Sequence, residues 1–205
     1  MRRILVLAAI AAVALLGTSC KSNSGDIYPM SVGSVWNMDM VVTLDTTTIA
    51  SPDTFATGTY VVTAVEKADL ASGGEVVKMK TEMSQHMKMP DTTISFTTYS
   101  YAREAGDWIL SYSDLSDSTG DTVMMTTPAV GKKWHQGTDI MEVVGQEDVT
   151  VKAGTYKSAW KVKMSNSDVE IFLWYAKGVG LVKVSSETQT PEMMTTLELT
   201  KATIK

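Results

Sequence analysis

The stretch 77–89 reads VKMKTEMSQHMKM, and its mostly apolar odd-numbered residues alternate with charged or polar even-numbered ones. Successive side chains of a β-strand point to opposite faces of the sheet, so this period of two predicts a strand with one buried and one solvated face. The solvated face would carry three lysines, a glutamate, a serine and His86. The buried face would consist of Val77, Met79, Thr81, Met83, Gln85, Met87 and Met89.

The same period recurs along the chain. In the run 36–44, a tryptophan, two methionines, a valine and a leucine share one face. Turn signals rich in glycine, proline, serine and aspartate separate such runs, and connections this short join antiparallel neighbours. Further strand-like runs are 60–65, 108–112, 160–164, 169–175, 181–184 and 193–200.

We therefore expect an all-β fold, a curved antiparallel meander that forms a partial barrel or a sandwich. After the first twenty residues no segment shows convincing helical amphipathicity, although 65–72 has room for one or two helical turns. Cys20 is the only cysteine, so no disulfide can staple this domain, and it must be stabilised by its own core.

The first twenty residues have the order of a bacterial secretory signal. Arg2 and Arg3 precede the apolar segment 4–16, and residues 17–20 read GTSC. An apolar helix of this length spans about 20 Å, which is too short for a hydrocarbon core of about 30 Å but suits a signal peptide. Small residues before a lone cysteine predict a lipobox, with cleavage before Cys20 and acylation of its thiol, although leucine usually stands where this chain has glycine.

These features predict a helical signal peptide at 1–19, a lipidated cysteine with a polar tether at 20–26, and a single β-domain at 27–205. The acyl chains on Cys20 would hold the domain at a membrane, because two or more chains anchor stably. Lys21 favours the outer membrane, so we expect an envelope lipoprotein facing the periplasm or the cell surface. The alternative is ordinary cleavage after Ser19, which leaves Cys20 as a free thiol.

The charge balance excludes one class of partner. Removing Arg2 and Arg3 with the signal reduces the 18 basic residues to 16, against 23 acidic ones, for a formal charge of −7. Nucleic-acid-binding domains need a basic surface, so we expect no nucleic-acid partner. Only Arg103 remains as an arginine, so an arginine cluster for phosphate is also excluded.

Candidate metal ligands and catalytic groups are few. Methionines such as those of 77–89 are ligands for Cu(I), but His86 falls on the opposite face, so one regular strand cannot gather them around a single metal. Three aspartates of the loop 114–121 lack the spacing of a regular calcium loop. His86 and His135 have no recognisable nucleophile context. We therefore predict no cofactor, no metal and no catalytic function.

Two segments, 29–36 and 128–134, share a Val-Gly-x-x-Trp pattern behind a proline. In each, proline and glycine would set a turn, and the bulky tryptophan would plug an end of the core. The simpler interpretation is two similar entries into a strand, and the alternative is a duplicated half-domain.

Four segments together resemble the TapB-like group of bacterial lipoproteins, whose function is largely unassigned. They are 28–36 (YPMSVGSVW), 130–134 (VGKKW), 149–156 (VTVKAGTY) and 174–183 (WYAKGVGLVK), in matching order and rough spacing. The third usually reads Val-Pro-Ala-Gly-Thr-Phe, whereas this chain has lysine and tyrosine in place of proline and phenylalanine. The resemblance implies an all-β envelope lipoprotein and supplies no catalytic residues.

Methionine is the unusual component of the predicted core. The chain has 14 methionines, including the start residue, against three phenylalanines. Flexible thioethers suit surfaces that accept varied apolar partners. We therefore hypothesise a binding module with an apolar ligand or lipid in its interior. A solid methionine core is the alternative, and it would make the domain a structural or protein-interaction subunit of an envelope assembly. The predicted lining is Met38, Met40, Met79, Met83 and Met87.

Overall fold

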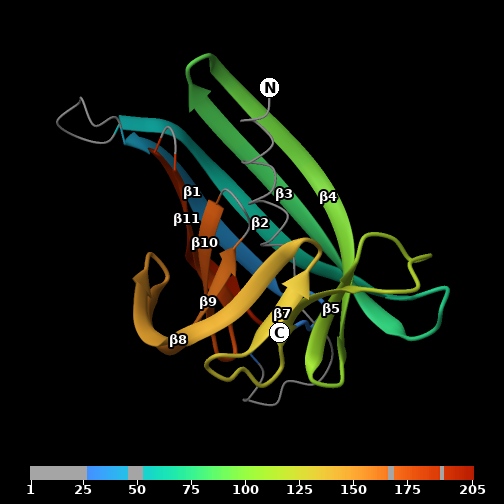
Figure 1. Cartoon of the computed structure of the whole chain (residues 1–205). Helices are drawn as coiled ribbons and strands as arrows, with labels where there is room; N and C mark the ends of the chain where they lie inside the picture. The colour runs from blue at the N-terminus through green and yellow to red at the C-terminus, as the bar shows by residue number, and fades with distance from the viewer. Residues whose placement is uncertain (1–26, 46–52, 166–168, 190–191) are drawn as a thin grey trace.

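The computed structural model describes residues 27–45, 53–165, 169–189 and 192–205 (Figure 1). All secondary-structure elements within these ranges are β-strands. None of these segments forms a helix of the length and hydrophobicity that crossing a membrane requires. The strands are β1 (Val35–Asp45), β2 (Asp53–Asp69), β3 (Glu75–Lys88), β4 (Asp91–Ala105), β5 (Trp108–Tyr112), β6 (Asp121–Met125), β7 (Lys133–Gln136), β8 (Asp139–Val151), β9 (Gly154–Ser165), β10 (Val169–Ala176), β11 (Gly180–Gln189) and β12 (Glu192–Thr203).

The strands form one antiparallel sheet that curls back on itself. Neighbours follow chain order from β1 to β6 and from β7 to β12, and β1 pairs with β12 where the two halves meet. The edge strands β6 and β7 come close to each other, and the rings of Trp108 and Trp134 lie 6.0 Å apart near this seam. The fold is a nearly closed barrel, which confirms the prediction of a curved all-β meander. The expected signal peptide, Cys20 and the tether lie outside the described residues.

The alternation seen in the sequence places side chains as expected. In β3, Met79 and Met83 are buried on the inner face, whereas Glu82 and His86 are exposed on the outer face. Met89 was expected to continue this strand, but β3 ends at Lys88 and Met89 is 70% exposed in the turn to β4. The strand therefore ends at Lys88, one residue earlier than predicted, and Met89 does not belong to the buried face.

One expectation about secondary structure was wrong, and several strands were not predicted. Residues 65–69 continue β2 and form no helical turn, because a bulge between Ala64 and Glu66 shifts the pairing with β3 and breaks the period of two. β4 was not predicted, since threonine, serine and tyrosine occupy both of its faces and leave little alternation. The short strands β6 and β7 and most of β8 were also missed.

Aromatic side chains plug one end of the barrel. The ring of Tyr28 lies 6.3 Å from Trp36 and 5.9 Å from Tyr175, and the Trp36 indole donates a 2.6 Å hydrogen bond to the carbonyl of Val179. The β8–β9 turn joins this end, because the amide of Ala153 donates to the carbonyl of Leu199 on β12 at 2.9 Å. Three of the four segments that carry the family resemblance thus meet at this plugged end. The β3–β4 turn lies at the opposite, far end (Figure 1).

The two Val-Gly-x-x-Trp segments adopt the same local structure. Gly33 and Ser34 exchange backbone hydrogen bonds with Ala64 of β2 at 2.8 and 3.0 Å. The segment 131–132 exchanges the same bonds with Val143 of β8, also at 2.8 and 3.0 Å. Each segment precedes the first strand of a six-stranded half, which agrees with the duplicated half-domain interpretation.

We expect Gly180→Ala to destabilise the barrel more than Gly178→Ala. Both glycines have positive φ, +95° and +73°, which costs alanine about 1–2 kcal/mol. A Cβ at Gly180 would also lie 3.2–3.4 Å from ring atoms of Tyr28, whereas one at Gly178 would have no described atom within 4 Å. Urea unfolding of both variants measures the difference, and equal losses would contradict a tightly packed plug.

Candidate functional site

The five predicted lining methionines all lie on the inner face of the sheet. Met38 and Met40 come from β1, and the other three come from β3. Four are no more than 6% exposed, and Met87, the one nearest the far end, is half-buried. The structure thus places all five on one surface, and ligand binding by them stays a prediction.

Strand register arranges these side chains in rows across the sheet. Met38 pairs with Tyr60, which pairs in turn with Met83 and, through it, with Phe96. The next row toward the far end contains Met40, Gly58 and Gln85, and the row after that contains Met87. Met79 lies nearer the plugged end, beyond Thr81 of the same strand. Four of the five methionines therefore form one band, and Met79 belongs to the core below it.

Gly58 makes room for a methionine in this band. A Cβ added at Gly58 would lie 2.4 Å from the Ser84 carbonyl oxygen and 2.9 Å from the terminal methyl carbon of Met40. Glycine normally weakens a strand, so a glycine within β2 indicates close approach of another group. Two groups approach Gly58 in this way, the Ser84 carbonyl on β3 and the Met40 methyl on β1.

Gln85 is the polar exception in the methionine band. Its side chain points inward between Met83 and Met87 of the same strand and is only 3% exposed. Among the described residues, its amide nitrogen has no hydrogen-bond partner. An unsatisfied buried donor costs about 1–3 kcal/mol. The sequence placed Gln85 on this face but gave no reason to assign it a role.

Two more polar groups lie on the inner face near the far end. Ser186 of β11 and Thr195 of β12 pair directly across the sheet, and both are buried. Neither hydroxyl has a hydrogen-bond partner in the part of the chain that the structure describes. Thr195 is in the same row as Val42, Ala56 and Met87. Gln85 on β3 and the pair of Ser186 and Thr195 on β11 and β12 thus place unpartnered polar atoms in two adjacent rows of the inner face.

The inner face is progressively less covered toward the far end. Apolar side chains at the plugged end are buried beneath the Tyr28 and Trp36 rings. Near the far end, by contrast, apolar inner-face or adjoining side chains are packed against the core yet stay partly exposed. These are Phe55, Met87, Phe96 and Met193.

The buried part of the inner face carries no charge. The buried residues of the described ranges include no aspartate, glutamate, lysine, arginine or histidine. Burial raises the pKa of Tyr60 and of Tyr175 far above the ordinary value, so both phenols stay neutral. A ligand here would meet thioethers, aromatic rings and neutral hydrogen-bonding groups only.

Charged side chains surround Trp174 on the outer face. The ammonium groups of Lys161 and Lys183 lie 5.1 and 5.8 Å from its ring, and its indole donates a 2.7 Å hydrogen bond to Glu147. This hydrogen bond and the nearby Lys161 hold the pKa of Glu147 below its ordinary value. These contacts cover a large outward-facing ring and need no ligand.

The histidines lie away from the methionine band. His86 is on the outer face, with Nδ1 3.3 Å from the Thr93 hydroxyl, as the strand pattern predicted. His135 is exposed on β7. Within the described ranges, no three histidine, cysteine, aspartate or glutamate side chains gather as a metal site.

The aspartates of the β5–β6 loop are occupied by local hydrogen bonds. Asp117 accepts from the amides of Asp114 and Ser113 and from the Ser113 hydroxyl, at 2.8–2.9 Å. Asp114 accepts in the same way from the amide and hydroxyl of Ser116. The loop folds over a small outer cluster of Leu70, Val76 and Tyr112. These carboxylates therefore shape a loop.

Asp117→Asn should remove part of the acid sensitivity of the fold. The hydrogen bonds from Asp114 and Ser113 lower the pKa of Asp117 in the folded state. Its stabilisation is therefore present above the unfolded pKa of about 3.9 and is lost as pH falls through the lower folded value. Melting temperatures measured from neutral pH to about pH 2 should start lower for the variant and fall less steeply below about pH 4. Asp121→Asn, at an exposed site, is the matched control and should follow the unmodified chain.

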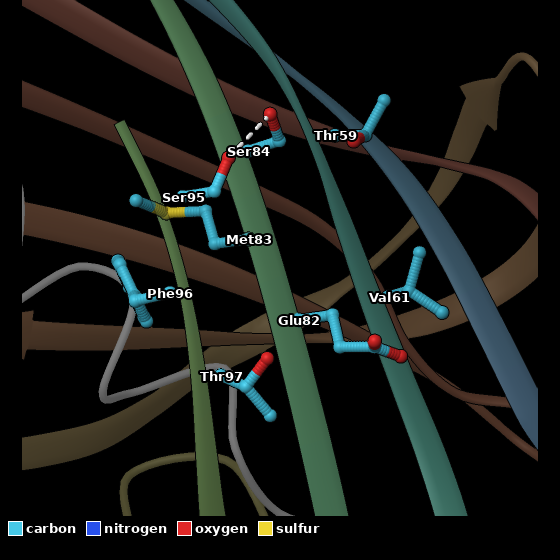
Figure 2. A pocket seen from close by; sticks show the side chains of 8 residues that line it. All are labelled: Thr59, Val61, Glu82, Met83, Ser84, Ser95, Phe96 and Thr97. Carbon is cyan, nitrogen blue, oxygen red and sulfur yellow. Dashed lines mark hydrogen bonds between the residues drawn. The ribbon is translucent and has the colours of Figure 1, made fainter. Parts of the chain in front are cut away.

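A shallow hollow of about 390 Å³ lies over β2, β3 and β4. Figure 2 shows its side chains, and most of them, including Thr59, Glu82, Ser84 and Thr97, are on the outer face. The hydroxyls of Ser84 and Ser95 hydrogen-bond to each other at 3.0 Å. The hollow is open and has a mixed polar and apolar lining, to which Met83 and Phe96 of the methionine band also contribute.

Comparisons with known proteins inform the fold. Protein-family models give no match, and curated proteins give none. Among solved structures, a candidate lipoprotein from Parabacteroides distasonis, 14% identical, matches with a TM-score of 0.50 over 89% of this chain and all of its own. That match shows a shared fold.

Two further structures match less closely. A candidate exported protein with a YmcC-like fold from Bacteroides fragilis, 11% identical, has a TM-score of 0.41 over 87% of this chain and 99% of its own. A β-barrel-like protein from Brucella abortus, of a domain family of unknown function, is 12% identical and has a TM-score of 0.36 over 86% and 99%. None of these matches names the TapB-like group, so that resemblance stays a prediction.

Proposed function

We propose that this chain is a lipid-anchored envelope protein that binds a lipid acyl chain on the methionine-lined inner face of its barrel. The acyl chain lies against Met38, Met40, Met83 and Met87 and enters from the far end. The ligand's polar head, a carboxyl or ester group, accepts a hydrogen bond from Gln85. No catalytic step is part of this proposal.

The unpartnered amide of Gln85 carries the proposal. A buried donor among methionines is costly in the empty protein, and the cost disappears when a ligand supplies an acceptor. Fatty acids and lipid esters combine such an acceptor with a long apolar chain. The hydroxyls of Ser186 and Thr195, close to the same level of the barrel, offer further partners for a polar head.

Two other features support an apolar chain as the ligand. Unbranched thioethers reshape easily around a flexible partner, so a lining rich in methionine suits acyl chains of varied length. The buried part of the inner face is neutral, and the inner face becomes less covered toward the far end, as an entrance for an uncharged chain requires. The flexibility of the methionine side chains and the partly exposed far end of the inner face thus both favour a lipid acyl chain as the ligand.

The membrane anchor in this proposal depends on the N-terminal pattern. The lipobox-like sequence that ends at Cys20, the resemblance of four segments to TapB-like lipoproteins, and a candidate lipoprotein among the structural neighbours all support it. The envelope location follows from the same features.

Gln85→Leu tests the ligand hypothesis, with Gln146→Leu on exposed β8 as the matched control. We expect a fluorescent palmitate analogue to bind the unmodified chain and the control equally, and to bind Gln85→Leu about three- to tenfold more weakly. The same variant should be more stable without ligand by about 1 kcal/mol, because an unpartnered amide is removed. Fluorescence titration and urea unfolding measure the two effects.

Native mass spectrometry supplies an independent readout. The chain purified from bacterial envelopes should carry adducts of lipid mass, and replacing Met83 and Met87 together with phenylalanine should reduce them. Palmitate-analogue binding that is absent, or unchanged by Gln85→Leu, would exclude this function and favour the interaction subunit.

A further inference from the structure

β4 has a long free edge near the far end of the barrel. On one side it pairs with β3 along Asp91–Ala102, but on the other side β5 begins to pair only at Tyr101. Among the described residues, no strand therefore lies beside the segment 92–99 on that second side. Figure 1 shows β4 at the margin of the sheet, with β5 reaching only its lower part.

This edge lacks the usual protection against pairing with another chain. Exposed edges are normally blunted by charges, proline or bulges. The segment 92–99 contains no charge and no proline, and its register with β3 is regular. Two of its larger side chains, Ile94 and Tyr99, are 41% and 50% exposed.

A second partly free strand, β8, is protected. β7 covers β8 only along Asp139–Glu142, and the rest of β8 extends beyond it. That part contains Glu147 and Asp148 and two register shifts, one after Val143 and one after Glu147. The free edge of β4 therefore lacks the charges and register shifts that protect the free part of β8 in the same sheet.

The sequence of the edge is nearly palindromic. Residues 92–98 read TTISFTT, a pattern that mirrors itself about Ser95 apart from the exchange of isoleucine and phenylalanine. Antiparallel pairing of two such strands around a two-fold axis places each residue opposite its mirror position, so symmetry makes the contacts self-complementary. A palindromic edge therefore suits a second copy of the same chain.

We propose that two copies of this chain pair through β4, antiparallel, with the two-fold axis at Ser95. Each Ile94 then lies opposite Phe96 of the partner subunit, and each Thr93 lies opposite Thr97 of the partner subunit. Pairs of a β-branched residue with an aromatic one, and of threonine with threonine, are favourable cross-strand neighbours. Asp91 lies outside the mirrored segment, so no like charges meet at the axis.

Cysteine placement tests this register. In the full chain carrying Cys20→Ser, Ser95→Cys puts the two new thiols opposite each other, with Cβ atoms about 4.5–5.5 Å apart. Thr97→Cys puts them four residues apart, about 13 Å at 3.3 Å per residue, beyond the reach of a disulfide. Both positions are exposed on the outer face, so the two variants are matched.

Mild oxidation should link Ser95→Cys into a covalent dimer and leave Thr97→Cys largely unlinked. A mixture of Thr93→Cys and Thr97→Cys chains should form linked pairs. Sedimentation should give twice the mass of one chain for the unmodified protein, and one chain's mass for Ser95→Lys, which sets two lysines face to face. Equal linking of Ser95→Cys and Thr97→Cys, or a single-chain mass for the unmodified protein, would overturn the proposal.

Discussion

The barrel depends on the pairing of its first and last strands. β1 and β12 are far apart in the chain, yet their register runs from Val35–Thr203 to Asp45–Glu192. Without this ladder, β1–β6 and β7–β12 would be two separate meanders, each with an inner face open to water. Side chains reinforce the junction, since the Thr200 hydroxyl donates to the carbonyl of Asn37 and the amide of Lys205 donates to the Ser34 hydroxyl. Bringing these distant segments together lowers the chain entropy, and burial of apolar surface in a shared core offsets that loss.

The plug and the methionine band have different roles in that core. Tyr28, Trp36 and Tyr175 are rigid rings that meet at one end, and the indole hydrogen bond to Val179 holds a turn against them. The methionines lie above this plug, where flexible side chains border a less covered end. The barrel is thus closed by rigid rings at one end and lined by flexible side chains toward the other. Within this band, Gln85 has a buried amide nitrogen that has no hydrogen-bond partner among the described residues.

The β4 edge follows from the length of its neighbour. β5 has five residues and β4 has fifteen, so most of β4 must lack a partner on that side. The β5–β6 loop turns away to cover Leu70, Val76 and Tyr112 on the outer face. The same part of the chain thus builds a small outer cluster and leaves an edge strand without charges. Both the methionine band and this edge extend toward the far end.

The sequence alone determined the fold class, the strands with strong alternation and the inward face of the methionines, because a period of two is a local property of the chain. It failed for β4 and for 65–69, where polar residues or a bulge remove the alternation. It placed Gln85 inside without showing that its amide lacks a partner, since partners come from other strands. Only the tertiary structure decided that the sheet closes, that three of the four family-like segments meet at one end of the barrel, and that β4 has a free edge. Each of these depends on which distant strands become neighbours, and that is set by the packing of the whole chain.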